Sequence, residues 1–157
     1  MKCARHWRGF SLLELLVVVG IILIISAIAI PNLLRSKITA NEVSAVGSLR
    51  TLNAACVSYS SSWGRGVPSA LSRLGPGSPT SATAAGLIDS VLATGTKSGY
   101  KLNYVSGAPK SGTISTYTIN ADPVAPNITG TRYFFTNQTG VIRYRIGGTA
   151  TAASSPI

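Results

Sequence analysis

An uninterrupted apolar run dominates the start of the chain. From Leu12 to Ile30 the sole charged side chain is Glu14, and Pro31 closes the run. As a helix at about 1.5 Å per residue, residues 10–30 would extend about 32 Å, which is enough to cross the hydrocarbon core of a bilayer. A carboxylate at membrane depth costs about 2.5–3.5 kcal/mol even on the mildest scales, so Glu14 predicts a functional role.

The residues before the run are basic, with Lys2, Arg5 and Arg8 in the first nine positions. Basic residues on this side predict a cytoplasmic N-terminus and an outward-facing remainder. An ordinary secretory signal cleaved before Ile30 is the alternative, because Ala27-Ile28-Ala29 has the small-residue pattern of a cleavage site. The length of the apolar run, the charge inside it and the helical pattern that continues past the supposed cut argue against this alternative.

A second pattern follows Pro31, where apolar residues recur at spacings of three, four or seven, as on one face of an α-helix. This stripe comprises Leu34, Ile38, Ala45, Leu49, Leu52, Cys56, Tyr59 and Trp63, whereas Arg35, Lys37, Glu42 and Arg50 are assigned to other faces. The two patterns together predict one helix of about fifty residues, apolar all round in its first half and amphipathic in its second. Pro31 removes a backbone donor and is expected to kink the helix.

After this spine, at residues 32–62, the pattern changes to turns and strands. Residues 63–97 are expected to form a loop, with a short helical turn at 68–74 and a helix over 81–93. Runs rich in aromatic and β-branched residues predict four antiparallel strands within 98–146, at 100–105, 114–119, 132–136 and 141–146. Asn137–Gly140 predicts a tight hairpin, and residues 147–157 a loose tail. The expected fold class is α+β, with a four-stranded antiparallel sheet packed on the helix spine.

The composition of the chain argues against metal, cofactor and catalytic sites. The 14 Lys and Arg against 4 Asp and Glu give a net charge of +10. This balance could favour anionic partners such as DNA, but no basic cluster follows residue 9, so a soluble surface explains it better. His6 is the single histidine, and Cys56 would be the single cysteine once the first nine residues are removed. No metal site, cofactor or catalytic residue is therefore expected.

Aromatic residues beside arginines on the predicted last strands could stack on single-stranded nucleic acid. The residues concerned include Tyr133, Phe135, Arg143 and Arg145. Packing in the sheet is the better interpretation, because aromatic residues are expected in strands. Nucleic acid therefore stays a weak candidate partner.

The combination of a short basic leader, Gly9-Phe10 and Glu14 resembles the processing and assembly signature of type IV prepilins and their secretion-system relatives. The resemblance covers about residues 9–34 and implies cleavage between Gly9 and Phe10, N-methylation of Phe10 and a helix kink at Pro31. It implies a leader at 1–9, a transmembrane or filament-core helix at 10–31, and a head at 32–157 with the type IV pilin fold. In such filaments Glu14 would pair with the Phe10 amine of a neighbouring copy, although a Glu merely tolerated near a helix end is the simpler alternative.

The resemblance implies a structural subunit of a type IV pilus, similar to a type IVa pilin, rather than an enzyme. Expected partners are copies of itself, a prepilin peptidase/methylase and an inner-membrane assembly machine with a cytoplasmic ATPase. The chain would lie in the bacterial inner membrane before assembly, and afterwards in an extracellular pilus or a periplasmic pseudopilus. Adhesion, twitching motility and DNA uptake all fit such a filament. The alternatives are a type II secretion pseudopilin and, more distantly, a secreted or membrane-anchored binding protein.

Overall fold

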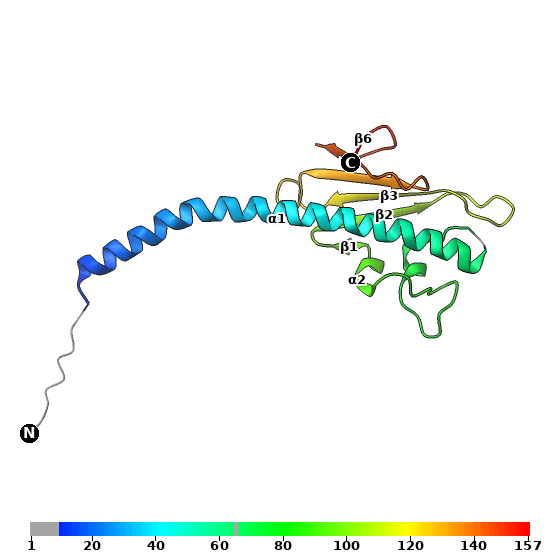
Figure 1. Ribbon diagram of the computed structural model, residues 1–157, viewed down its shortest axis with the longest axis horizontal. Helices are drawn as coiled ribbons and strands as arrows, with labels where there is room; N and C mark the ends of the chain where they lie inside the picture. Colours follow the sequence, from blue (N-terminus) through cyan, green and yellow to red (C-terminus); the bar gives the residue numbers. More distant parts are fainter. Residues whose placement is uncertain (1–9, 65) are drawn as a thin grey trace, which may run out of the picture. The chain divides into compact units, whose positions relative to one another are not determined.

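A long helix and a six-stranded sheet make up the fold. The computed structural model describes residues 10–64 and 66–157, so the predicted leader, including Gly9, lies outside the described residues (Figure 1). Helix α1 covers Leu12–Trp63, 52 residues, and confirms the single helix of about fifty residues expected from the sequence. The chain divides into two compact units, Met1–Ser36 and Lys37–Ile157, which are described separately.

The first unit contains the apolar part of α1. Pro31 lies inside the helix, where its missing N–H leaves one carbonyl of the preceding turn without its usual donor. Two polar side chains near it bond back to the helix, Asn32 Nδ2 to the Ile28 carbonyl at 3.1 Å and Ser36 Oγ to the Asn32 carbonyl at 3.0 Å. Helix therefore continues on both sides of Pro31, and the kink at Pro31 stays a prediction.

The second unit, called the head below, contains one antiparallel sheet in the strand order β1-β2-β3-β4-β5-β6. The strands are β1 Thr96–Lys97, β2 Tyr100–Ser106, β3 Tyr117–Pro123, β4 Arg132–Asn137, β5 Arg143–Ile146 and β6 Ser155–Pro156. The α+β class and the helix packed on an antiparallel sheet are confirmed, but the expected number of four strands is wrong. The two additional strands have two residues each, too short to show a period-2 pattern in the sequence.

Two expected elements differ from the structure. The strand expected at 114–119 lies at Tyr117–Pro123, because Ile114 leaves the sheet to bridge Gly66. The helix expected over 81–93 is reduced to α2, Ser90–Ala93, preceded by the 3₁₀ turn η1 at Leu71–Leu74. Gly86 has a φ of 65°, a left-handed conformation that interrupts any longer helix.

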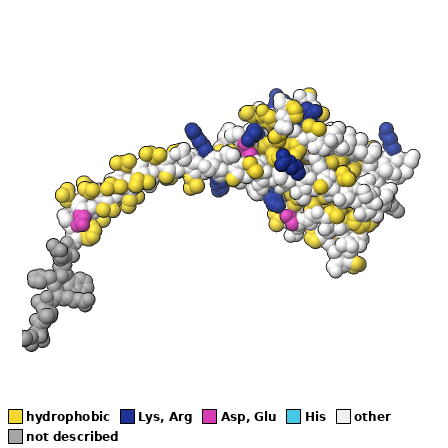
Figure 2. Space-filling model, in the orientation of Figure 1, with side chains coloured by type: hydrophobic (Ala, Val, Ile, Leu, Met, Phe, Trp, Pro, Cys, Tyr) yellow, Lys and Arg dark blue, Asp and Glu magenta, His cyan; other side chains and the backbone are white. Residues whose placement is uncertain are grey.

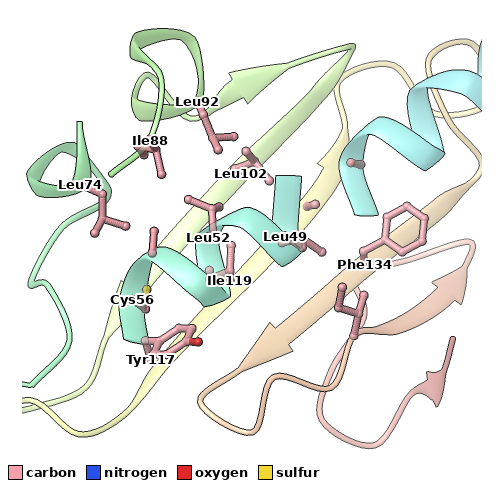
Figure 3. Packing of buried hydrophobic residues seen from close by; sticks show 14 of the residues in the cluster. Leu49, Leu52, Cys56, Leu74, Ile88, Leu92, Leu102, Tyr117, Ile119 and Phe134 are labelled. Atoms are coloured by element: carbon pink, nitrogen blue, oxygen red, sulfur yellow. The ribbon is translucent and has the colours of Figure 1, made fainter. Parts of the chain in front are cut away.

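The core of the head lies between α1 and one face of the sheet. Figure 3 shows Leu49, Leu52 and Cys56 of α1 pointing towards Leu102 and Ile119 of the sheet. Leu49, Leu52, Cys56 and Ile119 have no exposed surface, and each buried aliphatic side chain of this size contributes about 1.5–3 kcal/mol. On the other side of this core, Leu74, Ile88 and Leu92 from the 71–93 segment complete the cluster. The predicted stripe therefore packs as expected from Ala45 onward, whereas Leu34 is 56% exposed.

The tail after β5 crosses the opposite, outer face of the sheet and then pairs with β5. Ala150 is buried, and its carbonyl accepts a hydrogen bond from Asn120 Nδ2 at 2.9 Å. Arg143 donates through Nη1 to the Ser154 carbonyl at 2.9 Å. The segment 147–157 is thus attached at several points, in contrast to the loose tail expected from its small polar residues.

Candidate assembly site

Phe10 and Glu14 lie at the beginning of α1. Phe10 precedes the helix and is 73% exposed, and Glu14 lies in the first helical turn with an exposed side chain. The helix is already hydrogen-bonded at this point, since Leu15 donates to the Ser11 carbonyl at 3.2 Å. Gly9, the predicted processing residue, lies outside the described residues.

The location of Glu14 has two physical consequences. The first turn of a helix carries four backbone N–H groups without helical acceptors, so a carboxylate here is favoured by the helix dipole. The same carboxylate is exposed among the described residues. The predicted pairing with the Phe10 amine of a neighbouring copy involves two chains, and it stays a prediction.

The apolar part of α1 exposes its side chains among the described residues. Phe10 and the large hydrophobic residues between Leu12 and Ile30 are each at least 44% exposed, and the most apolar stretch of the helix is not buried at all. Figure 2 shows hydrophobic side chains along this part of the helix. Among the described residues, α1 is the one helix long and apolar enough to cross a membrane. Such a surface is stable only against lipid or other protein.

In the head, Glu42 joins α1 to the beginning of β4. Its Oε1 accepts hydrogen bonds from the backbone and hydroxyl of Thr131, at 2.8 and 2.7 Å, and from the Arg132 backbone at 3.1 Å. Its Oε2 accepts from Arg132 Nε at 2.7 Å. Burial alone would raise the pKa of Glu42, but these hydrogen bonds outweigh it and hold the pKa below its ordinary value. The neighbouring Asn41 donates to the Thr129 carbonyl at 2.9 Å, so two adjacent residues of α1 hold the 127–132 segment.

The expectation that Glu42 lies on a face of α1 other than the buried stripe is wrong. The residue is only 4% exposed. One signal was present, because Glu42 lies three residues before Ala45 and continues the buried stripe backwards. A polar residue in a buried stripe requires partners, and Arg132 stands at the beginning of a predicted strand.

The other two carboxylates of the head are also engaged or buried. Asp89 caps α2 by accepting from the Leu92 backbone and pairs with Lys97 at 3.0 Å. Oδ1 of Asp122 is buried without a hydrogen-bond partner among the described residues, and burial raises the pKa of this carboxyl. Basic side chains such as Lys101 and Arg145 are exposed. Within residues 10–64 and 66–157, no group of three His, Cys, Asp or Glu side chains is placed to hold a metal ion.

Two comparisons with known proteins give matches, and each covers a minor part of the chain. Residues 8–30 match the family model of the prokaryotic N-terminal methylation motif. The type IV wide pilus major component PilA4 of Thermus thermophilus is 50% identical over 38 residues, which cover 24% of this chain and 29% of that protein. No solved structure gives a significant match.

The match to the methylation motif contains Gly9, Phe10 and Glu14. The two matches confirm the resemblance to prepilins that the sequence shows at its N-terminus. The family model covers residues 8–30 and the PilA4 match covers 24% of the chain, so most of the head is described by the structure alone.

Proposed function

We propose that the chain is a structural subunit of a type IV pilus that polymerises through the apolar part of α1. The observation that carries the proposal is a helix that matches the prepilin methylation motif and whose apolar side chains are exposed among the described residues. In a bilayer, lipid covers this surface before assembly. In a filament, the helices of other copies replace the lipid. The PilA4 relative, a major pilus component, supports the same role.

Processing creates one of the two charged groups that assembly uses. Cleavage after Gly9 by a prepilin peptidase on the cytoplasmic side leaves Phe10 as the N-terminus, and its amine is then methylated. The helix from Leu12 onward remains intact, so the chain stays in the inner membrane until an assembly machine driven by a cytoplasmic ATPase extracts it. This route accounts for a basic leader followed by an apolar helix that is retained.

The second charged group is Glu14. A buried amine and a buried carboxylate are each costly alone, and removing one partner of a buried pair typically costs about 3–5 kcal/mol. Pairing Glu14 of one copy with the Phe10 amine of the next satisfies both groups. Apolar contact between smooth helices does not fix their axial offset, so this pair supplies the register of the filament.

Glu14→Ala tests this role. We expect the variant to accumulate in the membrane at wild-type level but to enter filaments poorly, because the partner amine is left unpaired. Ser26→Ala, another polar-to-apolar change in the same helix, is the matched control and should assemble normally. Wild-type filament yield from Glu14→Ala would remove the proposed pair.

Pilus and type II secretion pseudopilus share this N-terminus, so a deletion experiment distinguishes them. We expect surface filaments to disappear when this gene alone is deleted and to return on complementation. Loss of protein secretion with unchanged surface filaments would instead favour the pseudopilin.

Binding of DNA is a second candidate role, alongside adhesion and twitching motility. The observation that favours it is that Glu42 and Asp89 are each paired with a basic side chain of the head, while Lys101 and Arg145 are exposed. DNA retention by purified filaments should then fall steeply with salt, and replacing both basic residues by Gln should reduce the slope. Salt-independent retention would contradict an electrostatic contact.

A further inference from the structure

We infer that a groove on the head, between α1 and the β4–β5 end of the sheet, binds the apolar helix of a second copy of the chain. The inference rests on the proposed function, because it concerns how subunits pack. The groove lies wholly within the second compact unit, and we name it the β4–β5 groove. Its lining comes from α1, β4 and the tail: Glu42, Val43, Val46, Gly47, Arg50, Arg132, Phe134 and Ile157.

The groove exists because one helix is too narrow for this sheet. Six strands at about 4.8 Å spacing give a sheet about 24 Å wide, whereas a helix with its side chains is about 10 Å across and covers about two strands. In the core, α1 and the 71–93 segment pack against the inner faces of β2 and β3 and of the adjacent part of β4. On the inner face of β5, Tyr144 packs against this core, with the Arg132 guanidinium 5.7 Å from the centre of its ring. Beyond Tyr144 no second helix of the described chain covers this face.

Exposed apolar residues mark this uncovered part. Ile146 is opposite Arg132 in the β4–β5 pairing and belongs to the inner face, yet it is 68% exposed. Val43 on α1 and Ile157 in the tail, both in the lining, are 66% and 60% exposed. The groove has a volume of about 320 Å³, which has room for a few aliphatic side chains.

The lining is also shaped for the close approach of a helix. A Cβ atom added at Gly47 would meet nothing within 4 Å, so the α1 backbone is directly accessible there. Small residues at such positions allow two helices to pack closely. Arg50 is exposed at this border, and a long side chain of this kind can lay its aliphatic stem along apolar surface while its guanidinium stays in water.

The apolar part of α1 from a second copy of the chain is the occupant that we assign to the β4–β5 groove. The apolar part of α1 presents exposed aliphatic side chains along its length, and the β4–β5 groove has room for a few such side chains beside the exposed Val43 and Ile157. An acidic peptide is disfavoured because Arg132 is already paired with Glu42 at 2.7 Å, so Arg50 is the remaining cation of the lining. In the filament each head would therefore cover the helix of another copy and fill its own groove.

Cysteine crosslinking in assembled filaments tests this contact. Val43→Cys is combined with single cysteines placed in turn from Leu16 to Ile28, and sheared filaments are oxidised with copper phenanthroline. We expect dimers for a subset of positions that recur every three or four residues, which is one face of a helix. Val105→Cys, at a residue 53% exposed on the outer sheet face, is the matched control and should give no dimers with the same partners. Cys56 has no exposed surface and should not interfere.

Gly47→Leu gives an independent test. A Cβ atom at this position meets nothing within 4 Å, and leucine has a higher helix propensity than glycine, so the unfolding temperature should not fall. Filament yield should drop at least several-fold, because the side chain occupies the groove. Filaments that form normally from Gly47→Leu, or from Val43→Cys without dimers at any helix position, would overturn the groove contact and leave the proposed function intact. Absence of the wild-type chain from filaments would remove the proposed function itself.

Discussion

The buried carboxylate of Glu42 should be a principal stabilising contact of the head. Glu42→Gln keeps the size and one acceptor oxygen but presents an amide N–H group towards Arg132 Nε. Breaking a buried pair typically costs about 3–5 kcal/mol. Because the Arg132 side chain is 38% exposed and stays partly solvated, we expect a loss of about 2–3 kcal/mol in the free energy of unfolding.

The measurement is thermal unfolding of the full chain in detergent, followed by near-ultraviolet circular dichroism. For a head of this size the loss should lower the unfolding temperature by about 10 °C. Asp89→Asn removes the other ion-paired carboxylate but retains a side chain that can cap α2. This pair is exposed, at 34% for Lys97 and 54% for Asp89, so the control should change little.

The difference in the free energy of unfolding between wild type and Glu42→Gln should depend on pH, and this dependence is a sharper test. A carboxylate with a lowered folded pKa stabilises the protein above its unfolded pKa, about 4.5, and this contribution is lost as the pH falls through the folded value. The difference in the free energy of unfolding between wild type and Glu42→Gln should therefore be largest at pH 6–7 and should decrease below pH 4.5. The raised pKa of Asp122 changes stability with pH in the opposite direction. Because Asp122 is present in both proteins, its contribution cancels in the difference between them. Equal effects of the Glu42 and Asp89 variants, or a gap independent of pH, would refute the reasoning.

Two further predictions concern packing. Gly130→Ala places a Cβ atom against the Tyr100 hydroxyl, which donates to the Arg132 carbonyl at 2.8 Å; chemical denaturation should show a loss of about 2–3 kcal/mol. Gly47→Ala is its control and should gain about 0.5–1 kcal/mol, since its Cβ meets nothing within 4 Å; equal losses would contradict the assigned contact. Burial raises the pKa of the Cys56 thiol to about 12, so a thiol reagent at pH 8 should label the mature chain only on unfolding, and rapid labelling of the folded chain would show that the thiol is accessible.

Patterns that repeat along the chain predicted most of the fold. The stripe from Ala45 to Tyr59 predicted the buried face of α1, because spacing on a regular helix determines which residues lie together. The strand at Ser155–Pro156 could not be predicted, since two residues show no period and their pairing with β5 depends on the tail crossing the sheet. The longer helix expected over 81–93 failed because apolar spacing does not report the left-handed φ of Gly86.

The sequence likewise predicted some residues of the candidate site and could not predict others. A local motif predicts the roles of Gly9, Phe10 and Glu14, and residues 8–30 match the corresponding family model. The partnership of Glu42 with Arg132 joins residues 90 positions apart, so spacing along one helix could not reveal it. The β4–β5 groove likewise depends on which strands α1 covers, which only the three-dimensional arrangement shows.

Mass spectrometry of purified surface filaments tests the central claim most directly. We expect this chain as a component of the filaments, with an N-terminal peptide that begins at Phe10 and carries one methyl group on its amine. A mature N-terminus at Ile30, or filaments that do not contain the chain, would contradict the assignment as a pilus subunit.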